Sequence, residues 1–171
     1  LFLEILIGKN VMHKFHCTEL DFKICISQSI VDELFSHRQT HCFSKESGGM
    51  LFSNNLNDSE IEINKITTPS PSDLRKRNFF KLNEKKAKED IISFFEDGFH
   101  YLGDWHTHNE AVATPSGTDI RSIQDLFIKS GHTRPFFLML IIPNKENISN
   151  CYLAAADRKK LYEFKYQIID E

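Results

Sequence analysis

The segment from His106 to Asp119 constrains the fold of this chain more than any other segment. His106 and His108 are separated by one residue, and side chains two positions apart in an extended strand point to the same face. Ser116 and Asp119 follow after a short stretch that contains Pro115. The chain therefore needs a strand that ends in two imidazoles and a turn that brings a carboxylate back to them.

The residues Ser116 to Asp119 have two compatible interpretations. Their pattern is that of a helix capping box, with Ser116 as N-cap and Asp119 at the third helical position. Two imidazoles and a carboxylate are also the ligands that a catalytic zinc ion takes, with its fourth position left for water. The pair His106 and His108 also fits an ordinary strand with one buried, hydrogen-bonded imidazole. A capped helix start would hold Asp119 rigidly opposite the strand, so the cap and a metal site are compatible. We predict one zinc ion per chain, bound by the two imidazoles and this carboxylate.

This spacing, H-x-H-x7-S-x2-D, resembles the JAMM motif of the MPN metalloproteases, also called the JAB or Mov34 family. The family adds an upstream glutamate followed by glycine on the way into a strand, and Glu46 with Gly48-Gly49 fits that description. The resemblance covers roughly residues 20–166. It implies that Glu46 is the general base and that Ser116 donates a hydrogen bond to the oxyanion. The zinc ligands that it implies are His106, His108 and Asp119.

Two positions depart from the family pattern. Asn109 stands where many members have proline, and Ser53 stands where a glycine often closes the first strand. Neither change removes a ligand or the base, so both bear on the shape of the substrate groove. Inactive members that serve as scaffolds usually lack one or more of the five functional residues, and here all five are present. We therefore expect a catalytic member.

The order of apolar patterns indicates an α+β (mixed α/β) fold. Strands and helices alternate irregularly and no glycine-rich nucleotide loop is present, which disfavours a doubly wound dinucleotide fold. The resemblance implies an MPN/JAB-like curved mixed β-sheet flanked by helices, with a cytidine-deaminase-like architecture. The length of 171 residues fits a single domain over 1–171. Residues 1–20 are expected to form an N-terminal extension or a strand of uncertain pairing.

Three local expectations bear on the site. Residues 49–53 and 60–66 are expected to form a hairpin. Residues 84–96 are expected to form a helix whose apolar stripe packs in the core. In the strand 99–106, alternation places Leu102, Asp104 and His106 on one face, opposite Tyr101 and Trp105. Asp104 is then either a hydrogen-bond acceptor that orients a zinc-binding imidazole or a solvent-exposed residue at the strand end.

Composition excludes several classes of protein. A net charge of -3 and a pI near 6.3 give no reason to expect nucleic-acid binding. Four cysteines without C-x-x-C spacing argue against a disulfide framework and suit a reducing cytoplasm. The apolar opening Leu1 to Gly8 is too short to span a bilayer, so we expect neither a membrane anchor nor a signal peptide.

The resemblance also implies a substrate. Many family members cut the peptide or isopeptide bond after the C-terminal glycine of a ubiquitin-like protein. The wording of this motif is closest to prokaryotic stand-alone members, some of which reverse conjugation by E1- and E2-like enzymes in antiphage systems. Residues 67–80 lie where the family often places a groove-forming insertion, and Arg75-Lys76-Arg77 within them either meets an acidic partner surface or is solvated. The alternatives are a non-catalytic interaction module and a peptidase that processes a sulfur-carrier protein.

Overall fold

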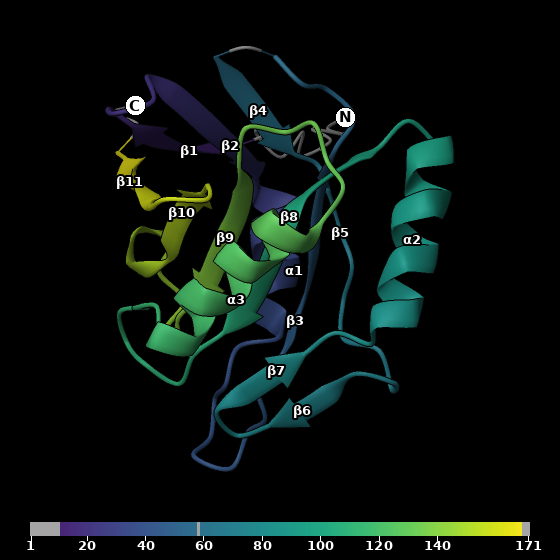
Figure 1. Cartoon of the computed structure of the whole chain (residues 1–171). Coiled ribbons are helices and arrows are strands. Elements are labelled where there is room, and N and C mark those ends of the chain that lie inside the picture. Colours follow the sequence, from purple (N-terminus) through teal and green to yellow (C-terminus); the bar gives the residue numbers. More distant parts are fainter. Residues whose placement is uncertain (1–10, 58, 169–171) are drawn as a thin grey trace, which may run out of the picture.

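The computed structural model describes residues 11–57 and 59–168, which form one large mixed sheet with helices on both faces (Figure 1). The strand order is β4-β2-β1-β11-β10-β9-β8-β3-β5. Neighbouring strands are antiparallel except for β2–β4 and β8–β9. The strands of this sheet are β1 (Met12–Cys17), β2 (Phe22–Ser27), β3 (Gly48–Ser53), β4 (Glu60–Ile63), β5 (Lys65–Ile66), β8 (His100–Thr107), β9 (Phe137–Ile142), β10 (Tyr152–Ala156) and β11 (Leu161–Gln167).

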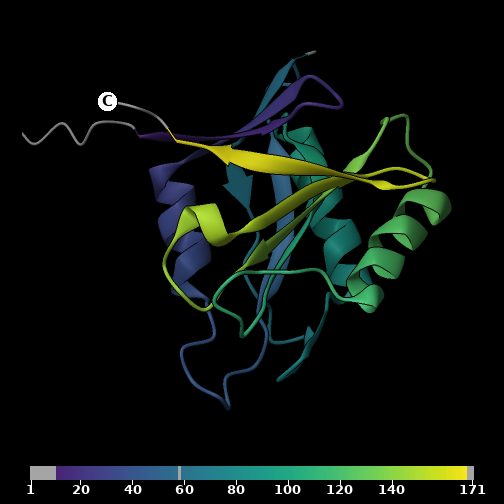
Figure 2. The same cartoon turned by 90° about the vertical axis from the view of Figure 1, so that its left-hand side faces the viewer.

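The remaining elements surround this sheet. A separate two-stranded hairpin is formed by β6 (Leu74–Lys76) and β7 (Phe79–Lys81). The helices are α1 (Gln28–Ser36), α2 (Glu84–Glu96), α3 (Gly117–Lys129) and the short 3-10 helix η1 (Ile148–Asn150). Seen from the side, α1 covers one face of the sheet, and α2 and α3 lie beyond the other (Figure 2). This arrangement confirms the expected α+β fold with a curved mixed sheet.

Strand β9 divides the core into two layers. All six of its residues are buried, as expected for a central strand covered on both faces. Leu138 and Leu140 belong to the larger cluster, which includes Leu34 of α1. Met139 belongs to the smaller cluster, which includes Ile123 of α3. The parallel neighbour β8 pairs with β9 from Gly103 to Thr107; it contains His106 and ends directly before His108.

The expected hairpin of residues 49–53 and 60–66 is wrong in its pairing. Glu60–Ile63 forms β4, which pairs in parallel with β2, and only Lys65–Ile66 returns to β3 as β5. β4 and β5 stand at opposite ends of the strand order although Asn64 alone separates them. The sheet therefore curls until its two edges approach each other at Asn64, and this closure cannot be read from local alternation.

The face assignment in β8 holds for Asp104 and His106, which lie opposite the buried Trp105, but it is wrong for Tyr101 and Leu102, because the strand contains a bulge next to Gly103. Leu51 pairs with Gly103 and Phe52 pairs with Tyr101, so one residue of β8 is skipped. Gly103 has a φ of 145°, and a Cβ there would lie 2.0 Å from the carbonyl oxygen of Leu138. The bulge places Leu102 in the same buried cluster as Trp105.

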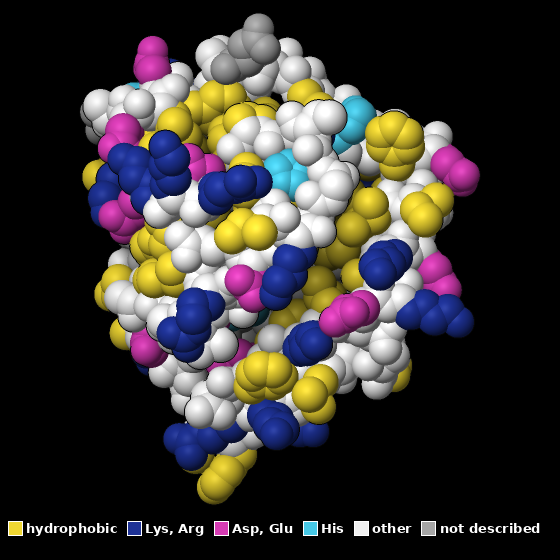
Figure 3. Space-filling model, in the orientation of Figure 1, with side chains coloured by type: hydrophobic (Ala, Val, Ile, Leu, Met, Phe, Trp, Pro, Cys, Tyr) yellow, Lys and Arg dark blue, Asp and Glu magenta, His cyan; other side chains and the backbone are white. Residues whose placement is uncertain are grey.

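Helix α2 forms at the expected residues but is not a core helix. None of its residues is buried, and Ile92 and Phe95 are 62% and 64% exposed. The helix contacts the sheet through Phe94, whose ring lies 4.9 Å from that of Phe52. Ile92, Phe95 and Phe137 are among the residues that line an open hollow. Figure 3 shows that hydrophobic side chains are exposed on this face of the molecule. The aromatic stripe is therefore shared between the sheet and solvent.

The N-terminal strand has defined partners. β1 pairs with β2 and with β11, which settles the pairing for Met12–Cys17. Residues 1–10 of the expected N-terminal extension lie outside the described residues. Within the described part of the chain, no helix is long and apolar enough to cross a membrane.

Candidate active site

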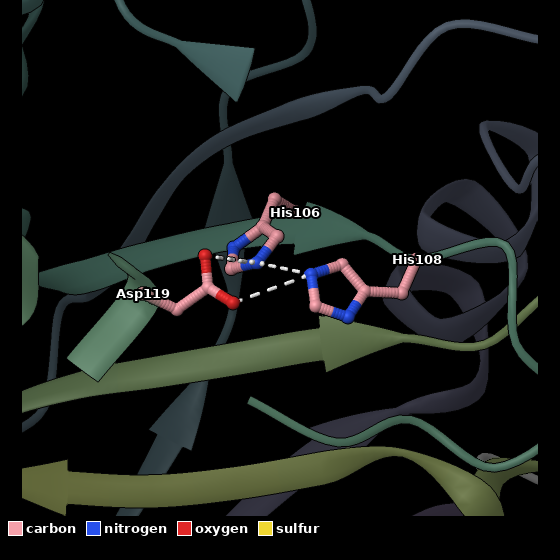
Figure 4. Close-up of side chains that lie close together, drawn as sticks. All are labelled: His106, His108 and Asp119. Carbon is pink, nitrogen blue, oxygen red and sulfur yellow. Dashed lines mark hydrogen bonds and ion pairs between the residues drawn. The ribbon is translucent and has the colours of Figure 1, made fainter. Parts of the chain in front are cut away.

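The three predicted metal ligands point toward one another (Figure 4). The Nε2 atoms of His106 and His108 are 3.1 Å apart. Each lies 3.4 Å from a different carboxylate oxygen of Asp119. One ligand atom from each residue lies within 4.8 Å of the others. Ligands at the usual zinc distances are about 3.3 Å apart around a tetrahedral ion, so this donor set fits zinc.

Asp119 is held by the capping box that the sequence predicts. Its Oδ2 accepts a hydrogen bond of 2.7 Å from the Ser116 amide, and its own amide donates to Ser116 Oγ at 3.1 Å. Burial raises the pKa of the Asp119 carboxyl, but hydrogen bonds from His106, His108 and Ser116 outweigh burial and hold the pKa well below its usual value. The carboxylate is therefore ionised and fixed in direction before any ligand binds.

The segment that carries Glu46 runs beside the ligand strand. Gly48 pairs with His106, and Thr107 exchanges two hydrogen bonds with Ser47, through its Oγ1 (3.0 Å) and its amide (2.8 Å). Continued by two residues, this register places Glu46 opposite His108. The structure thus brings the predicted base to the predicted ligands, although 60 residues separate Ser47 from Thr107.

The environment of Glu46 suits a group that exchanges protons near neutral pH. The residue is 8% exposed. Burial raises the pKa of its carboxyl to about 7, the charge of His108 lowers it, and that of Asp119 raises it. A carboxyl with a pKa near the operating pH can both accept and release a proton efficiently.

The roles predicted for Ser116 and Asp104 stay predictions, and the described contacts of Asp104 include no imidazole. Ser116 is exposed, and its Oγ accepts a hydrogen bond from the Asp119 amide. The Asp104 carboxylate accepts a hydrogen bond of 2.8 Å from Tyr101 Oη, and burial raises its pKa to about 6. For the described residues, this is the one hydrogen bond found for the Asp104 carboxylate.

Two residues near the site were missed by the sequence reasoning. Glu110 Oε2 lies 3.9 Å from His108 Nδ1 and accepts a hydrogen bond of 2.9 Å from Thr114 Oγ1. The sequence signal that could have identified Glu110 was its position two residues after His108. The other is Arg75, which was considered only for a groove or a solvated loop, and which contacts the backbone of Glu46. No local signal points to that contact.

Comparison with known proteins decides the family. The model of a family described as prokaryotic homologs of the JAB domain matches residues 27–154. The chain belongs to this family. The match spans the JAB domain from the start of α1 to the middle of β10 and contains every predicted site residue. It confirms the resemblance on which the predicted roles were based.

Two relatives of this JAB domain have the same name. A protein of Escherichia coli (strain TW11681) called "CD-NTase/cGAS isopeptidase" is 35% identical over 107 residues, which are 61% of this chain and 68% of that protein. A protein of Vibrio cholerae serotype O1 with the same name is 29% identical over 150 residues, covering 86% and 90% of the two chains. The solved structure of DSY2949 from Desulfitobacterium hafniense is 18% identical with a TM-score of 0.59, covers 81% of this chain and 87% of its own, and supports the fold.

Proposed function

We propose that this JAB domain is a zinc-dependent isopeptidase that hydrolyses the amide bond after the C-terminal glycine of a ubiquitin-like protein. The observation that carries the proposal is the convergence of the ligand group with the buried carboxyl of Glu46, in a family whose relatives are named isopeptidases. The bond cut would be the isopeptide bond of a conjugate or the peptide bond of a precursor.

The side chains of the site divide the chemistry among them. Zinc held by His106, His108 and Asp119 would act as a Lewis acid on the scissile carbonyl and make water easier to deprotonate. Glu46 would take the proton from the attacking water and pass it to the leaving amine, for which a pKa of about 7 is well matched. The hydroxyl of Ser116 would donate a hydrogen bond to the oxyanion of the tetrahedral intermediate.

The names of the relatives support a more specific substrate. We infer that the conjugates cleaved include those that join a ubiquitin-like protein to a CD-NTase enzyme, formed by E1- and E2-like enzymes in an antiphage system. Neither nucleic acid nor a membrane is expected as a partner. Four free cysteines, two of them buried, suit a reducing cytoplasm.

The test combines metal analysis with cleavage of a fusion that carries a reporter after the C-terminal glycine of a ubiquitin-like protein. The unaltered protein should bind about one zinc per chain and cleave the fusion. Glu46→Gln should keep zinc and lower kcat by at least about 100-fold, whereas Glu89→Gln on the exposed side of α2 should match the unaltered protein. Normal cleavage by Glu46→Gln would refute the assignment of the base.

Two alternatives make different predictions in the same assay. A non-catalytic interaction module would bind zinc and a ubiquitin-like protein but cleave none of the fusions. A sulfur-carrier peptidase would cleave only fusions to a sulfur-carrier protein. Cleavage of a lysine-linked conjugate, in which the bond is an isopeptide, supports the proposal over both.

A further inference from the structure

The β6–β7 hairpin contacts both main-chain polar groups of Glu46. Arg75 Nε donates a hydrogen bond of 2.8 Å to the carbonyl oxygen of Glu46. The amide of Glu46 donates one of 2.8 Å to the carbonyl oxygen of Lys76. Arg75 Nη2 also donates to Ser47 Oγ at 2.6 Å. The segment that carries the base is thus bonded to β6 at consecutive residues.

Apolar packing and a third residue fix the hairpin in the same place. A Cβ at Gly48 would lie 2.5 Å from two carbons of the Phe80 ring, so the ring packs directly over the start of β3. The buried side chain of Gln39 donates a hydrogen bond of 2.9 Å to the carbonyl oxygen of Arg77. The hairpin therefore has a defined position against the Glu46 segment.

The opposite side of the segment is bonded to the ligand strand through Ser47 and Thr107. Residues 46 and 47 consequently lie between β8 and β6, with hydrogen bonds to each. Arg75 is half-buried, and among the described residues no carboxylate lies within salt-bridge distance of its guanidinium. Its donors go to the main chain and hydroxyl of the Glu46 segment instead.

We propose that Arg75 is a positioning residue for the general base, an inference that rests on the proposed function. Its guanidinium holds the main chain of Glu46 so that the carboxyl stays beside His108 and Asp119. Displacement of a catalytic group by about 1 Å can lower the rate about 100-fold. Arg75 is therefore not a free groove or loop charge, whereas Arg77 of the same basic run is exposed and contacts Gln39 only through its carbonyl.

The experiment compares Arg75→Gln, Arg75→Lys and the matched control Arg77→Gln, which loses the same charge from the same hairpin. In the fusion assay, Arg75→Gln should lower kcat about 10- to 100-fold with KM within about twofold. Arg75→Lys should have a kcat between those of Arg75→Gln and the unaltered protein, because a single ammonium group replaces a guanidinium that donates to two acceptors. Arg77→Gln should behave as the unaltered protein, and all three should retain zinc.

Amide hydrogen exchange supplies a readout that does not depend on catalysis. The Glu46 amide is bonded to Lys76, so Arg75→Gln should speed its exchange, and Arg77→Gln should leave it unchanged. Ser47→Ala removes one of the two acceptors of Arg75 and should lower kcat less than Arg75→Gln. Combined with Arg75→Gln, it should add nothing further.

Specific results would overturn the inference. One is a kcat of Arg75→Gln equal to that of Arg77→Gln; another is a rise in KM alone, which would mean that Arg75 contacts the substrate. If Arg75→Gln fails to fold, Arg75→Lys decides, and full kcat together with unchanged Glu46 exchange in that variant refutes the role. Failure of the proposed function looks different, because the unaltered protein and Arg77→Gln would then cleave nothing.

Discussion

Thr107 Oγ1 accepts a hydrogen bond of 3.0 Å from the backbone amide of Ser47. Thr107 lies between the two predicted ligand histidines in sequence, but alternation turns its side chain to the opposite face, where it is fully buried. Ser47 follows the predicted base directly. The strand of the predicted ligands and the segment of the predicted base are therefore connected through a fully buried side chain.

Thr107→Val tests this connection while keeping the side-chain shape. The buried Ser47 amide loses its acceptor, so we expect the free energy of unfolding to fall by about 1–3 kcal/mol. Equilibrium denaturation in urea measures this change. Thr18→Val at an exposed turn should change it by no more than about 0.5 kcal/mol. Equal effects of the two substitutions would show that the hydrogen bond contributes little.

Asp119→Asn separates the capping role of this residue from metal binding. The amide oxygen of asparagine can still accept the Ser116 amide, so helix α3 should keep its start. Loss of the charge should weaken zinc binding by more than about 100-fold, beyond the effect of residues that only support a ligand. Zinc content after dialysis reports the result. Asp125→Asn, exposed on the same helix, should keep zinc; retention by Asp119→Asn would contradict its assignment as a ligand.

Ser116→Ala and Asn83→Ala remove comparable helix caps. Ser116 Oγ accepts the Asp119 amide, and Asn83 Oδ1 accepts the Lys86 amide at 3.0 Å. Each substitution should cost about 1 kcal/mol of stability. Ser116→Ala alone should also lower kcat about 100-fold, because the oxyanion loses a donor. Thermal unfolding and the fusion assay on both variants distinguish the roles, and equal kcat values would remove Ser116 from catalysis.

Gly103→Ala tests the bulge in β8. An added methyl group would collide with the carbonyl oxygen of Leu138 at 2.0 Å, and the φ of 145° disfavours any residue other than glycine. We expect a loss of about 3 kcal/mol or more, measured by urea denaturation. At Gly131 an added Cβ has no neighbour within 4 Å, so Gly131→Ala should change stability by no more than about 0.5 kcal/mol.

Thiol reactivity should follow burial. Burial raises the pKa of Cys151 to about 12 and, with Glu60 adding to it, that of Cys25 to about 11. Both thiols are therefore protonated at pH 8, and the thiolate is the reactive form. Iodoacetamide should label the exposed Cys42 in the native protein and reach Cys25 and Cys151 only after unfolding, as mass spectrometry of the peptides would show. Native labelling of Cys151 would contradict this assignment.

The elements of the fold and the ligand set were predictable because their signals are local. The helix at 84–96 follows from apolar periodicity. The capping box is predicted by the four residues from Ser116 to Asp119 alone, and it is present in the structure. The same short segment contains all three predicted ligands, so the sequence by itself indicated where a metal would bind.

Only the tertiary structure decided what joins the site to its surroundings. The bulge at Gly103 depends on the close approach of Leu138, and the division of residues 60–66 depends on the curling of the whole sheet. Arg75 reaches Glu46 across 29 residues of sequence. Contacts of this kind depend on the packing of distant segments, which leaves no periodic signal along the chain. The sequence therefore indicated which residues form the candidate metal site, and the packing of the hairpin and β8 determined how the segment of Glu46 is held beside them.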